Sequence, residues 1–323
     1  DDAFAACEAR SAASAVERAA PGVATARGID VDRVRTLAYT HAASELLATT
    51  DAEVDAAEAA LQAATIDRSG SVAVRARDVR STTGCSTQTA ERRLGSVLVD
   101  RGFSVDLDDP DHELRVLFSE GEVDGERRNR CFIGWLTVES KRDFGERRPT
   151  DRPFFQPGSM APLDARALVN IAGAGPDTRV VDPMCGTGGL LLEAGLVGSD
   201  VIGVDAQWKM TRGSRENLDA LLDGGGFEII HGDATALPLS DGAADAVVFD
   251  APYGRQSKIA RHELADLVGG ALAEARRIAD RAVVVADRSW ETEAREAGWT
   301  VDRRFERRVH GTLVRHVHVL SAE

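Results

Sequence analysis

The chain has 323 residues, 43% of them hydrophobic, which allows two domains that each bury a core. No stretch approaches the roughly 18–20 apolar residues that cross a bilayer, and no signal-peptide pattern opens the chain, so we expect a cytoplasmic protein rather than a membrane or secreted one. The formal net charge is −14 at pH 7, and only three of the 39 basic residues are lysines, which leaves 36 arginines. We interpret this acidic, lysine-poor composition as typical of a salt-rich cytoplasm.

The pattern of cysteine and histidine gives no sign of a metal site. The four cysteines are scattered and none forms a C-x-x-C pair, which argues against zinc and against a disulfide framework. His316 and His318 share one strand face, but without a third ligand we interpret them as polar strand residues. We therefore expect a metal-free protein in a reducing compartment. We also expect a monomer.

The first 144 residues mix helical and strand patterns, which predicts a small α+β unit. Helices are predicted over Ala3–Ala20, Asp51–Thr65 (with Asp51 as N-cap) and Ser86–Arg101, and strands over Val34–Tyr39, Ser71–Val79, Leu114–Phe118 and Cys131–Glu139. Residues 145–163 are rich in Arg, Pro, Gly and Phe without periodicity, so we expect an inter-domain linker there.

From residue 164 to the end, apolar strands alternate with helices, which predicts a parallel sheet covered on both faces. The strands are predicted over Thr178–Asp182, Val201–Asp205, Phe227–Gly232, Ala246–Asp250 and Arg281–Asp287, the helices over Gly189–Leu196, Lys209–Leu222 and Arg261–Ala279, and a closing hairpin over Val301–Val309 and Thr312–Leu320. Ligands of such sheets bind beyond the carboxyl ends of the strands.

The first candidate site is the segment D-P-M-C-G-T-G-G, residues 182–189, between the first strand of this sheet and a helix. Glycines there let the backbone approach a ligand, and the helix N-terminus offers free N–H groups. The spacing G-x-G-G differs from the G-x-G-x-x-G of nucleotide dehydrogenases. For Cys185 we expect a small packing role, and Glu193, one helical turn later, either touches a cofactor or solvates the helix.

Two further acids follow the next two strands. Asp205 ends the second strand, where a carboxylate can accept hydrogen bonds from two ribose hydroxyls. Asp233 follows the third strand, where it can accept from an adenine amino group with the Ala234 N–H facing the ring. Asp182, Asp205 and Asp233 lie 23 and 28 residues apart, at three successive strand ends. Each alone could be a helix N-cap, but together they predict an adenosine site without a phosphate site.

The sharpest signal is D-A-P-Y, residues 250–253, at the end of the fourth strand. An exocyclic base amine is a poor nucleophile because its lone pair is delocalised. The Asp250 carboxylate and a backbone carbonyl of Ala251 or Pro252 can accept its two N–H bonds and turn the lone pair towards a methyl sulfonium. Pro252 keeps the backbone extended, and Tyr253 offers a flat face for a flipped base. Such catalysis is mainly positioning and electrostatics.

These segments resemble motifs I and IV of the class I amino-methyltransferases, which carry a D/N-P-P-Y loop, with Ala251 where the common pattern has Pro. R-P-F-F-Q-P-G-S-M-A-P, residues 152–162, resembles the family's motif X, which lines the methionine end of the cofactor. From the first residues to the closing hairpin, the chain is similar to archaeal tRNA guanine-N2 dimethyltransferases acting at tRNA position 10, which carry an N-terminal THUMP-type RNA-binding region.

The resemblance implies a Rossmann-like α/β domain with a mostly parallel seven-stranded sheet (residues 164–323), preceded by an α+β region with a THUMP domain (residues 1–144). It implies S-adenosylmethionine as cofactor and tRNA as partner. The catalytic residues are then Asp250, Pro252 and Tyr253, and the cofactor-binding residues are Phe155, Pro157, Asp182, Cys185, Gly186, Gly188, Asp205, Asp233 and Ala234.

A local excess of positive charge predicts where RNA would bind. Residues 126–152 hold eight Lys or Arg against five acids, a balance of +3 in a chain of −14. Arginine suits phosphate because its planar fork binds two oxygens, although a solvated charged loop is an equally good interpretation for any single side chain. The expected RNA-binding residues are Arg127, Arg128, Arg130, Arg142, Arg147, Arg148 and Arg152. In high salt, shape and 2′-OH contacts would then carry recognition of the tRNA.

Other functions stay open at this point. A THUMP-bearing rRNA guanine methyltransferase and a DNA adenine or cytosine amino-methyltransferase use the same loop, although the N-terminal half disfavours DNA. A nicotinamide dehydrogenase would use Asp205 but leave residues 250–253 idle. A non-catalytic RNA-binding protein with a methyltransferase fold is disfavoured by the intact acids at positions 182, 205, 233 and 250.

Overall fold

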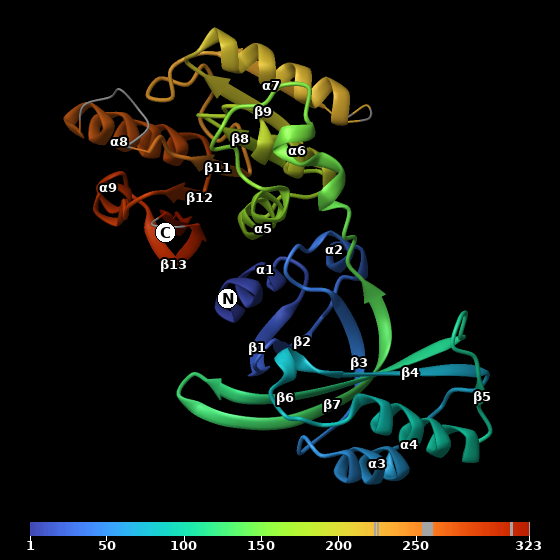
Figure 1. Cartoon of the computed structure of the whole chain (residues 1–323). Helices are drawn as coiled ribbons and strands as arrows, with labels where there is room; N and C mark the ends of the chain where they lie inside the picture. Colours follow the sequence, from blue (N-terminus) through green and yellow to red (C-terminus); the bar gives the residue numbers. More distant parts are fainter. Residues whose placement is uncertain (223, 225, 254–260, 311–312, 323) are drawn as a thin grey trace. The chain divides into compact units, whose positions relative to one another are not determined.

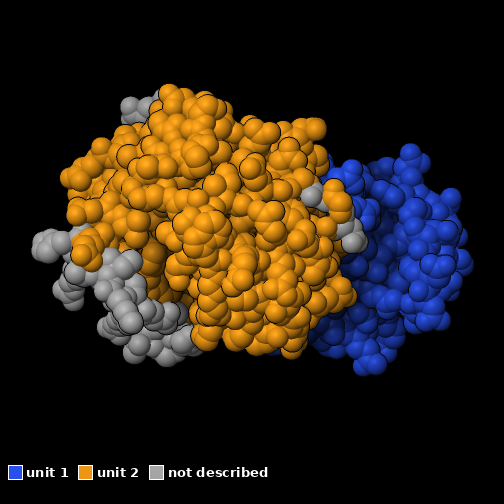
Figure 2. Space-filling model, turned by 90° about the horizontal axis from the view of Figure 1, so that it is seen from above, with its two compact units in different colours: residues 1–35, 40–140 blue, residues 36–39, 141–323 orange. Residues whose placement is uncertain are grey.

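The computed structural model describes all residues except 223, 225, 254–260, 311–312 and 323, and it forms two compact units (Figure 2). Unit 1 comprises Asp1–Arg35 and Thr40–Ser140, and unit 2 comprises Thr36–Tyr39 and Lys141–Glu323. The segment expected as a linker, residues 145–163, therefore lies inside unit 2. It holds most of the short 3₁₀ helix η2 (Phe144–Arg147), the helix η3 (Pro149–Asp151) and the start of α5.

Unit 1 is built on a five-stranded sheet in the order β3-β7-β6-β4-β5, with a separate β1–β2 hairpin (Figure 1). Helices α3 and α4 pack on the sheet over a core that includes Leu61, Leu94 and Phe118. The elements are α1 (Asp2–Ala9), β1 (Ser14–Ala20), β2 (Val23–Arg27), α2 (Val31–Thr36), β3 (Ala42–Thr50), α3 (Val54–Ala63), β4 (Ser71–Asp78), η1 (Val79–Ser81), α4 (Thr87–Asp100), β5 (Ser104–Val105), β6 (His112–Val123) and β7 (Glu126–Glu139).

Two predictions for the N-terminal segment are wrong. The helix expected over Ala3–Ala20 ends at Ala9, and Ser14–Ala20 form strand β1. Alanine has the highest helix propensity of all residues, but propensity is readily overridden by tertiary contacts, here the pairing with β2 and the burial of Val16. The strand expected over Val34–Tyr39 is replaced by helix α2, which ends at Thr36.

The helix predicted over Asp51–Thr65 is confirmed as α3, but its N-cap is Glu53 rather than Asp51. Asp51 instead forms an ion pair of 2.9 Å with Arg130 of β7. The helix predicted from Ser86 is confirmed as α4, and the Ser86 hydroxyl caps it by accepting from the backbone N–H of Thr89. The other three predicted strands of this half are confirmed, as β4 and as parts of the longer β6 and β7.

Unit 2 is built on a seven-stranded sheet in the order β10-β9-β8-β11-β12-β14-β13, with helices on both faces (Figure 1). The first five strands of that order run parallel, and β14 and β13 close the sheet as an antiparallel hairpin. The strands are β8 (Arg179–Asp182), β9 (Asp200–Asp205), β10 (Phe227–His231), β11 (Ala246–Asp250), β12 (Arg281–Ala286), β13 (Thr300–His310) and β14 (Leu313–Ser321). The predicted Rossmann-like fold is confirmed.

The helices of unit 2 are α5 (Pro162–Ala172), α6 (Gly189–Leu196), α7 (Trp208–Leu221), α8 (Arg261–Ile278) and α9 (Glu291–Glu296). Three of them, α6, α7 and α8, match the predicted helices, and α5 and α9 were not predicted. The central strands are buried on both faces, as in β11, where Val247, Val248 and Phe249 have no exposed surface. The sheet order reverses between β8 and β11, which is where open α/β sheets bind ligands.

Candidate active site

Three carboxylates gather at the point where the strand order reverses. Asp205, Asp182 and Asp250 are the last residues of the neighbouring strands β9, β8 and β11. The Asp182 side chain is buried, and its Oδ1 accepts the backbone N–H of Met184 at 3.0 Å. Burial, together with the nearby Asp205 and Asp250, raises the pKa of Asp182 well above its usual value. The cluster therefore holds carboxyl groups whose ionised form a cationic ligand would stabilise.

The glycine-rich turn of residues 182–189 has the backbone geometry that the sequence predicted. Gly186 and Gly188 have positive φ angles of 52° and 77°. A Cβ atom on Gly188 would lie 2.5 Å from the Ser214 hydroxyl oxygen, so this position also lacks room for a side chain. Helix α6 begins directly after Gly188 without a side-chain cap, which leaves its first N–H groups available to a ligand. Cys185 is buried in the turn, as expected for a packing residue.

Asp205 lies beside this turn. Its Oδ2 accepts the N–H of Gly186 at 3.0 Å, and its Oδ1 accepts the N–H of Gln207 at 2.8 Å. Burial raises the pKa of Asp205, and these two hydrogen bonds oppose the shift. Each carboxylate oxygen has a second lone pair, so two ribose hydroxyls can still bind here. The geometry thus fits the ribose-binding role expected of Asp205.

The loop after β10 carries the third expected acid. Asp233 is exposed, and its Oδ1 accepts from both the backbone N–H and the hydroxyl of Thr235, each at 2.8 Å. Ala234 beside it is buried. The exposed Trp208 at the start of α7 stacks on His231, with ring centres 4.0 Å apart. Sequence reasoning missed this stacked pair, because the two residues lie 23 positions apart.

The loop after β11 sets out Asp250 and Tyr253 as a hydrogen-bonded pair. The backbone N–H of Ala251 bonds to the carbonyl of Val285 in β12 at 2.8 Å, which fixes the start of the loop. The Tyr253 hydroxyl donates to Oδ2 of Asp250 at 3.3 Å. Oδ1 of Asp250 is buried, and among the described residues it has no hydrogen-bond partner. A buried carboxylate oxygen without a partner is costly unless a ligand supplies the donor.

The surroundings of Asp250 raise the pKa of its carboxyl group but leave it mostly ionised at neutral pH. Burial raises its pKa to about 6; Arg315 and the Tyr253 hydroxyl oppose that shift, and Asp287 adds to it. Because the raised pKa still lies below 7, the carboxylate is mostly ionised at neutral pH and can accept an N–H. Perturbed carboxyl groups of this kind concentrate at functional sites.

The segment that resembles motif X is tied to the glycine-rich turn. The Ser159 hydroxyl lies 3.1 Å from the Thr187 hydroxyl, and the side chain of Asn217 in α7 bonds to both Phe154 and Thr187. Phe155 and Pro157, the residues expected to contact the cofactor, are exposed. Sequence reasoning missed Asn217, whose amide joins three segments of the site.

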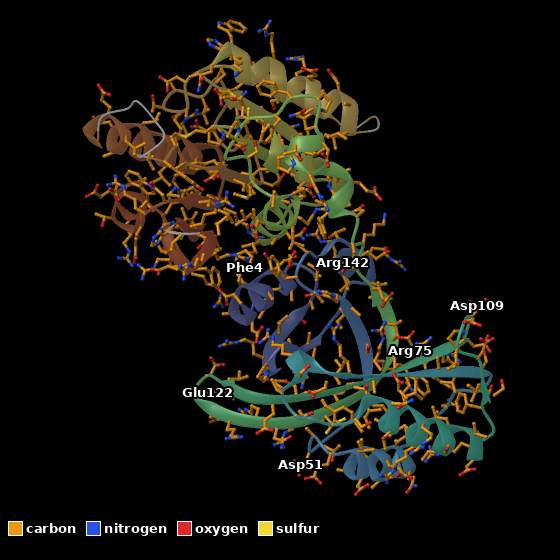
Figure 3. The ribbon with its side chains drawn as sticks, in the orientation of Figure 1. Phe4, Asp51, Arg75, Asp109, Glu122 and Arg142 are labelled. Atoms are coloured by element: carbon orange, nitrogen blue, oxygen red, sulfur yellow. The ribbon has the colours of Figure 1, made fainter. Side chains whose placement is uncertain are left out.

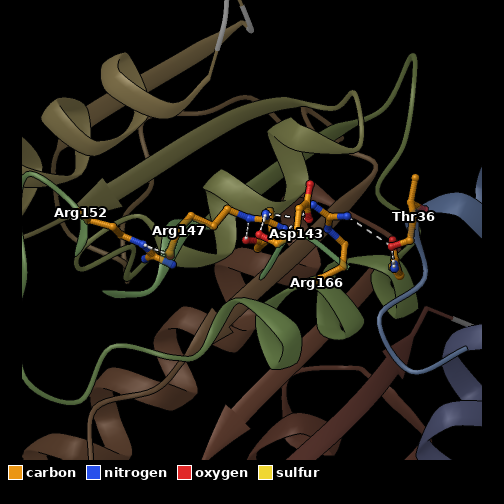
Figure 4. Close-up of polar contacts among 7 residues, drawn as sticks. Thr36, Asp143, Arg147, Arg152 and Arg166 are labelled. Carbon is orange, nitrogen blue, oxygen red and sulfur yellow. Dashed lines mark hydrogen bonds and ion pairs between the residues drawn. The ribbon is translucent and has the colours of Figure 1, made fainter. Parts of the chain in front are cut away.

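Behind the turn lies a buried arginine cluster, which Figure 4 shows. Glu193 of α6 has no exposed surface and accepts from Arg147 at 2.6 Å and from Arg166 of α5 at 2.8 Å. Arg147 also pairs with Asp143 at 2.8 Å. Glu193 therefore neither touches a cofactor nor solvates its helix, so both expectations for it are wrong. Its role is to join α5 and α6 to the segment before motif X.

This burial corrects the predicted RNA-binding set. Arg147 and Arg152 are only 6% and 5% exposed, and the Nε of Arg152 donates to the backbone carbonyl of Arg147 at 3.2 Å. Neither can meet a phosphate in this conformation, so both leave the set.

The other five arginines are exposed or half-buried, and the structure gives most of them internal partners. Arg127 and Arg128 pair with Glu120 and Glu126, and Arg130 pairs with Asp51, which Figure 3 labels. Arg142, also labelled there, donates to the carbonyl of Ala38 and lies over the Phe144 ring. Arg148 is exposed. Neutralising phosphates would therefore require most of these side chains to leave an existing partner.

His316 and His318 both lie on strand β14. His318 is buried, and its Nε2 accepts the backbone N–H of Trp290 at 3.2 Å. His316 lies 3.7 Å from Glu306. In the part of the chain that the structure describes, no three His, Cys, Asp or Glu side chains gather as metal ligands would. None of the described helices is both long and apolar enough to span a membrane.

Known proteins are similar to this chain in sequence. A family model described as RMKL-like, methyltransferase domain, matches residues 149–316. The tRNA (guanine(10)-N2)-dimethyltransferase of Methanothermobacter thermautotrophicus is 36% identical over 299 residues, which cover 88% of this chain and 83% of that protein. The enzyme of the same name from Pyrococcus abyssi is 29% identical over 261 residues, covering 78% and 74%.

Among solved structures, the crystal structure of TrmN from Thermus thermophilus matches with a TM-score of 0.47 and 22% identity, covering 93% of this chain and 89% of that one. The family model spans about half of the chain, and the relative from Methanothermobacter thermautotrophicus extends the match over most of it. The chain therefore belongs to the RMKL-like methyltransferase family.

Proposed function

We propose that this protein transfers methyl groups from S-adenosylmethionine to N2 of a guanosine in tRNA, at position 10, in one or two rounds. One structural observation carries the chemistry: Oδ1 of Asp250, which has no hydrogen-bond partner among the described residues, lies at the strand edge that also holds Asp182 and Asp205. Two relatives that match most of the chain are named tRNA (guanine(10)-N2)-dimethyltransferases, which supports guanine as the base and tRNA as the substrate.

The residues present fit the adenosylmethionine cofactor. The Asp205 carboxylate suits the ribose, Asp233 and Ala234 suit the adenine, and the free N–H groups at the start of α6 suit the methionine end. The family resemblance adds Phe155 and Pro157 at that end. When bound, the cofactor supplies an electrophilic methyl group on a sulfonium, whose positive charge the acids at the strand tips would favour.

The residues of the loop after β11 prepare the nucleophile. A flipped guanine offers two N–H bonds on N2, one to Oδ1 of Asp250 and the other to the carbonyl of Ala251 or Pro252. Both acceptors draw the nitrogen towards a pyramidal geometry, so that its lone pair becomes available. The ring of Tyr253 can stack on the extruded base. Because positioning does most of the catalysis, the amine need not lose a proton before it attacks.

The proposal also assigns the parts of the chain that bind RNA. We propose that unit 1 holds a THUMP-type RNA-binding domain, and that Arg127, Arg128, Arg130, Arg142 and Arg148 lie along the path of the tRNA. A cytoplasmic, monomeric enzyme of a salt-rich cell remains part of the proposal, on the strength of the lysine-poor, acidic composition. An rRNA guanine methyltransferase is the main alternative, and the names of these two relatives, which specify tRNA, disfavour it.

Nucleoside analysis tests the proposal. Unmodified tRNA is incubated with the protein and methyl-labelled cofactor, then digested and separated. We expect the label in N2-methylguanosine and N2,N2-dimethylguanosine, and none from a tRNA whose position 10 is not guanosine. Label in adenosine or a pyrimidine would refute the guanine assignment. In a parallel reaction with rRNA, label in rRNA but not in tRNA would favour the rRNA alternative.

A further inference from the structure

Arg315 lies next to the proposed catalytic pair without belonging to its loop. It is a residue of β14, the strand beside β12, and its side chain is 9% exposed. Its Nε donates to the Tyr253 hydroxyl oxygen at 2.9 Å. The same hydroxyl lies 3.3 Å from Oδ2 of Asp250. Arg315, Tyr253 and Asp250 thus form a chain of hydrogen bonds.

The chemistry of the groups fixes the direction of that chain. A guanidinium has only donors, so the phenol oxygen must accept from Arg315. The phenol then has a single proton to give, and an ionised carboxylate can only accept it. Burial and the neighbouring Asp250 raise the pKa of Tyr253, so the phenol keeps this proton. Oδ2 of Asp250 therefore already accepts one hydrogen bond, whereas Oδ1 accepts none from the described residues and is the oxygen more open to a ligand.

Arg315 also forms an ion pair with Asp164. Its Nη1 lies 3.7 Å from Oδ2 of Asp164, in the first turn of α5. Oδ1 of Asp164 accepts from the Tyr39 hydroxyl at 2.6 Å and lies 3.2 Å from Arg307 of β13. A carboxylate with three partners has little freedom to move. It keeps the guanidinium of Arg315 directed at Tyr253 in the absence of any ligand.

We propose that Arg315 is a positioning residue for methyl transfer: it orients the Tyr253 ring and, through the Tyr253 hydroxyl, assigns Oδ1 of Asp250 to the base amine. The inference rests on the proposed function, because it names the atom that receives the substrate. Without Arg315 the phenol of Tyr253 is free to rotate, and either oxygen of Asp250 can face the base amine. Misplacing a reacting group by about 1 Å can cost about a hundredfold in rate.

Arg315 also shapes the electrostatics of Asp250. The groups that face Asp250 are Arg315 from β14, Tyr253 from its own loop, Asp287 after β12 and Asp182 at the tip of β8. Burial and Asp287 oppose the ionised carboxylate of Asp250, whereas Arg315 and the Tyr253 hydroxyl favour it. Removing the Arg315 charge therefore moves the pKa of Asp250 upward, and the acid limb of the rate profile moves with it.

Three substitutions of Arg315 separate its charge from its geometry. Arg315→Met removes charge and donor, Arg315→Gln keeps an N–H donor without charge, and Arg315→Lys keeps the charge without the planar fork. Arg304→Gln is the matched control, because Arg304 lies on the neighbouring strand β13, is 47% exposed and pairs with Glu291. For each variant, kcat, KM for tRNA and the pH profile are measured, and affinity for S-adenosylhomocysteine is measured by calorimetry.

We expect Arg315→Met to lower kcat about a hundredfold, with a smaller change in KM and unchanged affinity for S-adenosylhomocysteine. In both Arg315→Met and Arg315→Gln, the acid limb of the pH–rate profile shifts to higher pH. Arg315→Lys keeps the acid limb of the pH–rate profile at its wild-type position but recovers only part of kcat. The control Arg304→Gln matches the wild type in both. If Arg315→Met does not fold, the contrast between the Gln and Lys variants decides in the same way.

The inference would be overturned if folded Arg315→Met kept the wild-type kcat and lost activity at the same acidic pH as the wild type. It would also be overturned if the Gln and Lys variants lost activity at the same acidic pH. Lost affinity for S-adenosylhomocysteine would also overturn it, because Arg315 would then act on the cofactor site. Failure of the proposed function looks different: the wild-type protein itself would not methylate guanosine.

Discussion

Asp250 should destabilise the protein at neutral pH. Its folded pKa of about 6 lies above the reference value of 3.8, so between those values the native carboxyl is protonated while the unfolded one is ionised. Stability from this group is fully present below pH 3.8 and is lost as the pH rises through about 6. A difference of about 2 pKa units corresponds to about 3 kcal/mol, at about 1.4 kcal/mol per unit.

The substitution Asp250→Asn removes this titration. We expect the unfolding free energy of the variant, relative to that of the wild type, to increase by about 2–3 kcal/mol between pH 4 and pH 8, because at pH 4 the unfolded carboxyl is already partly ionised. Comparing the two pH values cancels the constant effect of placing an amide in the site. Urea denaturation at fixed salt measures the difference, and Asp219→Asn is the control, because Asp219 is exposed on α7.

A difference between wild type and Asp250→Asn that stays constant from pH 4 to pH 8 would refute this reasoning. Asp250 would then be ionised in the folded protein as readily as in the unfolded chain. In that case it would not be a carboxylate held under strain for function.

Three further predictions concern other parts of the site. Glu193→Gln leaves two buried arginines without their shared counter-charge and should cost about 3 kcal/mol or more in urea denaturation, whereas a loss below about 1 kcal/mol would mean that the cluster behaves like a surface pair. Gly188→Ala should be less stable and bind S-adenosylhomocysteine less tightly than Gly242→Ala, which has a similar φ of 65° but open space around it; equal effects would contradict the crowding at Ser214. Combining Arg127→Ala with Arg148→Ala should weaken tRNA binding and reduce its salt dependence by about two charges, and an unchanged salt slope would remove both from the RNA path.

The sequence predicted the parallel sheet of unit 2 well because its strands are unbroken apolar runs that end in acids. A run such as Ala246–Asp250 carries its own burial signal, and the tips of parallel strands meet at one edge whatever the details of packing. This is why the expected ribose and base sites fall together at the edge formed by β9, β8 and β11.

The N-terminal segment was predicted poorly because its local preferences conflict with its tertiary contacts. Alanine-rich residues 14–20 become a strand through pairing with β2, which no local pattern announces. Val34 lies in α2, and Leu37 and Ala38, which follow the end of the helix, are buried without strand pairing; a short apolar run of this kind does not distinguish a strand from other buried segments.

The partners that hold the site are distant in sequence. Arg315 lies 62 residues from Tyr253, and Glu193 lies 46 residues from Arg147, so neither pair has a local signature. Arg147 and Arg152 were grouped with exposed arginines because charge is counted along the chain, whereas burial depends on packing. Asn217 and Asp164 were missed for the same reason.

A crystal structure with S-adenosylhomocysteine bound tests the central claim most directly. We predict that the adenosine lies beside Asp205 and Asp233, with the sulfur facing the side of Asp250 that carries Oδ1. Density for the compound at any place other than the tips of β8, β9 and β11 would contradict the account.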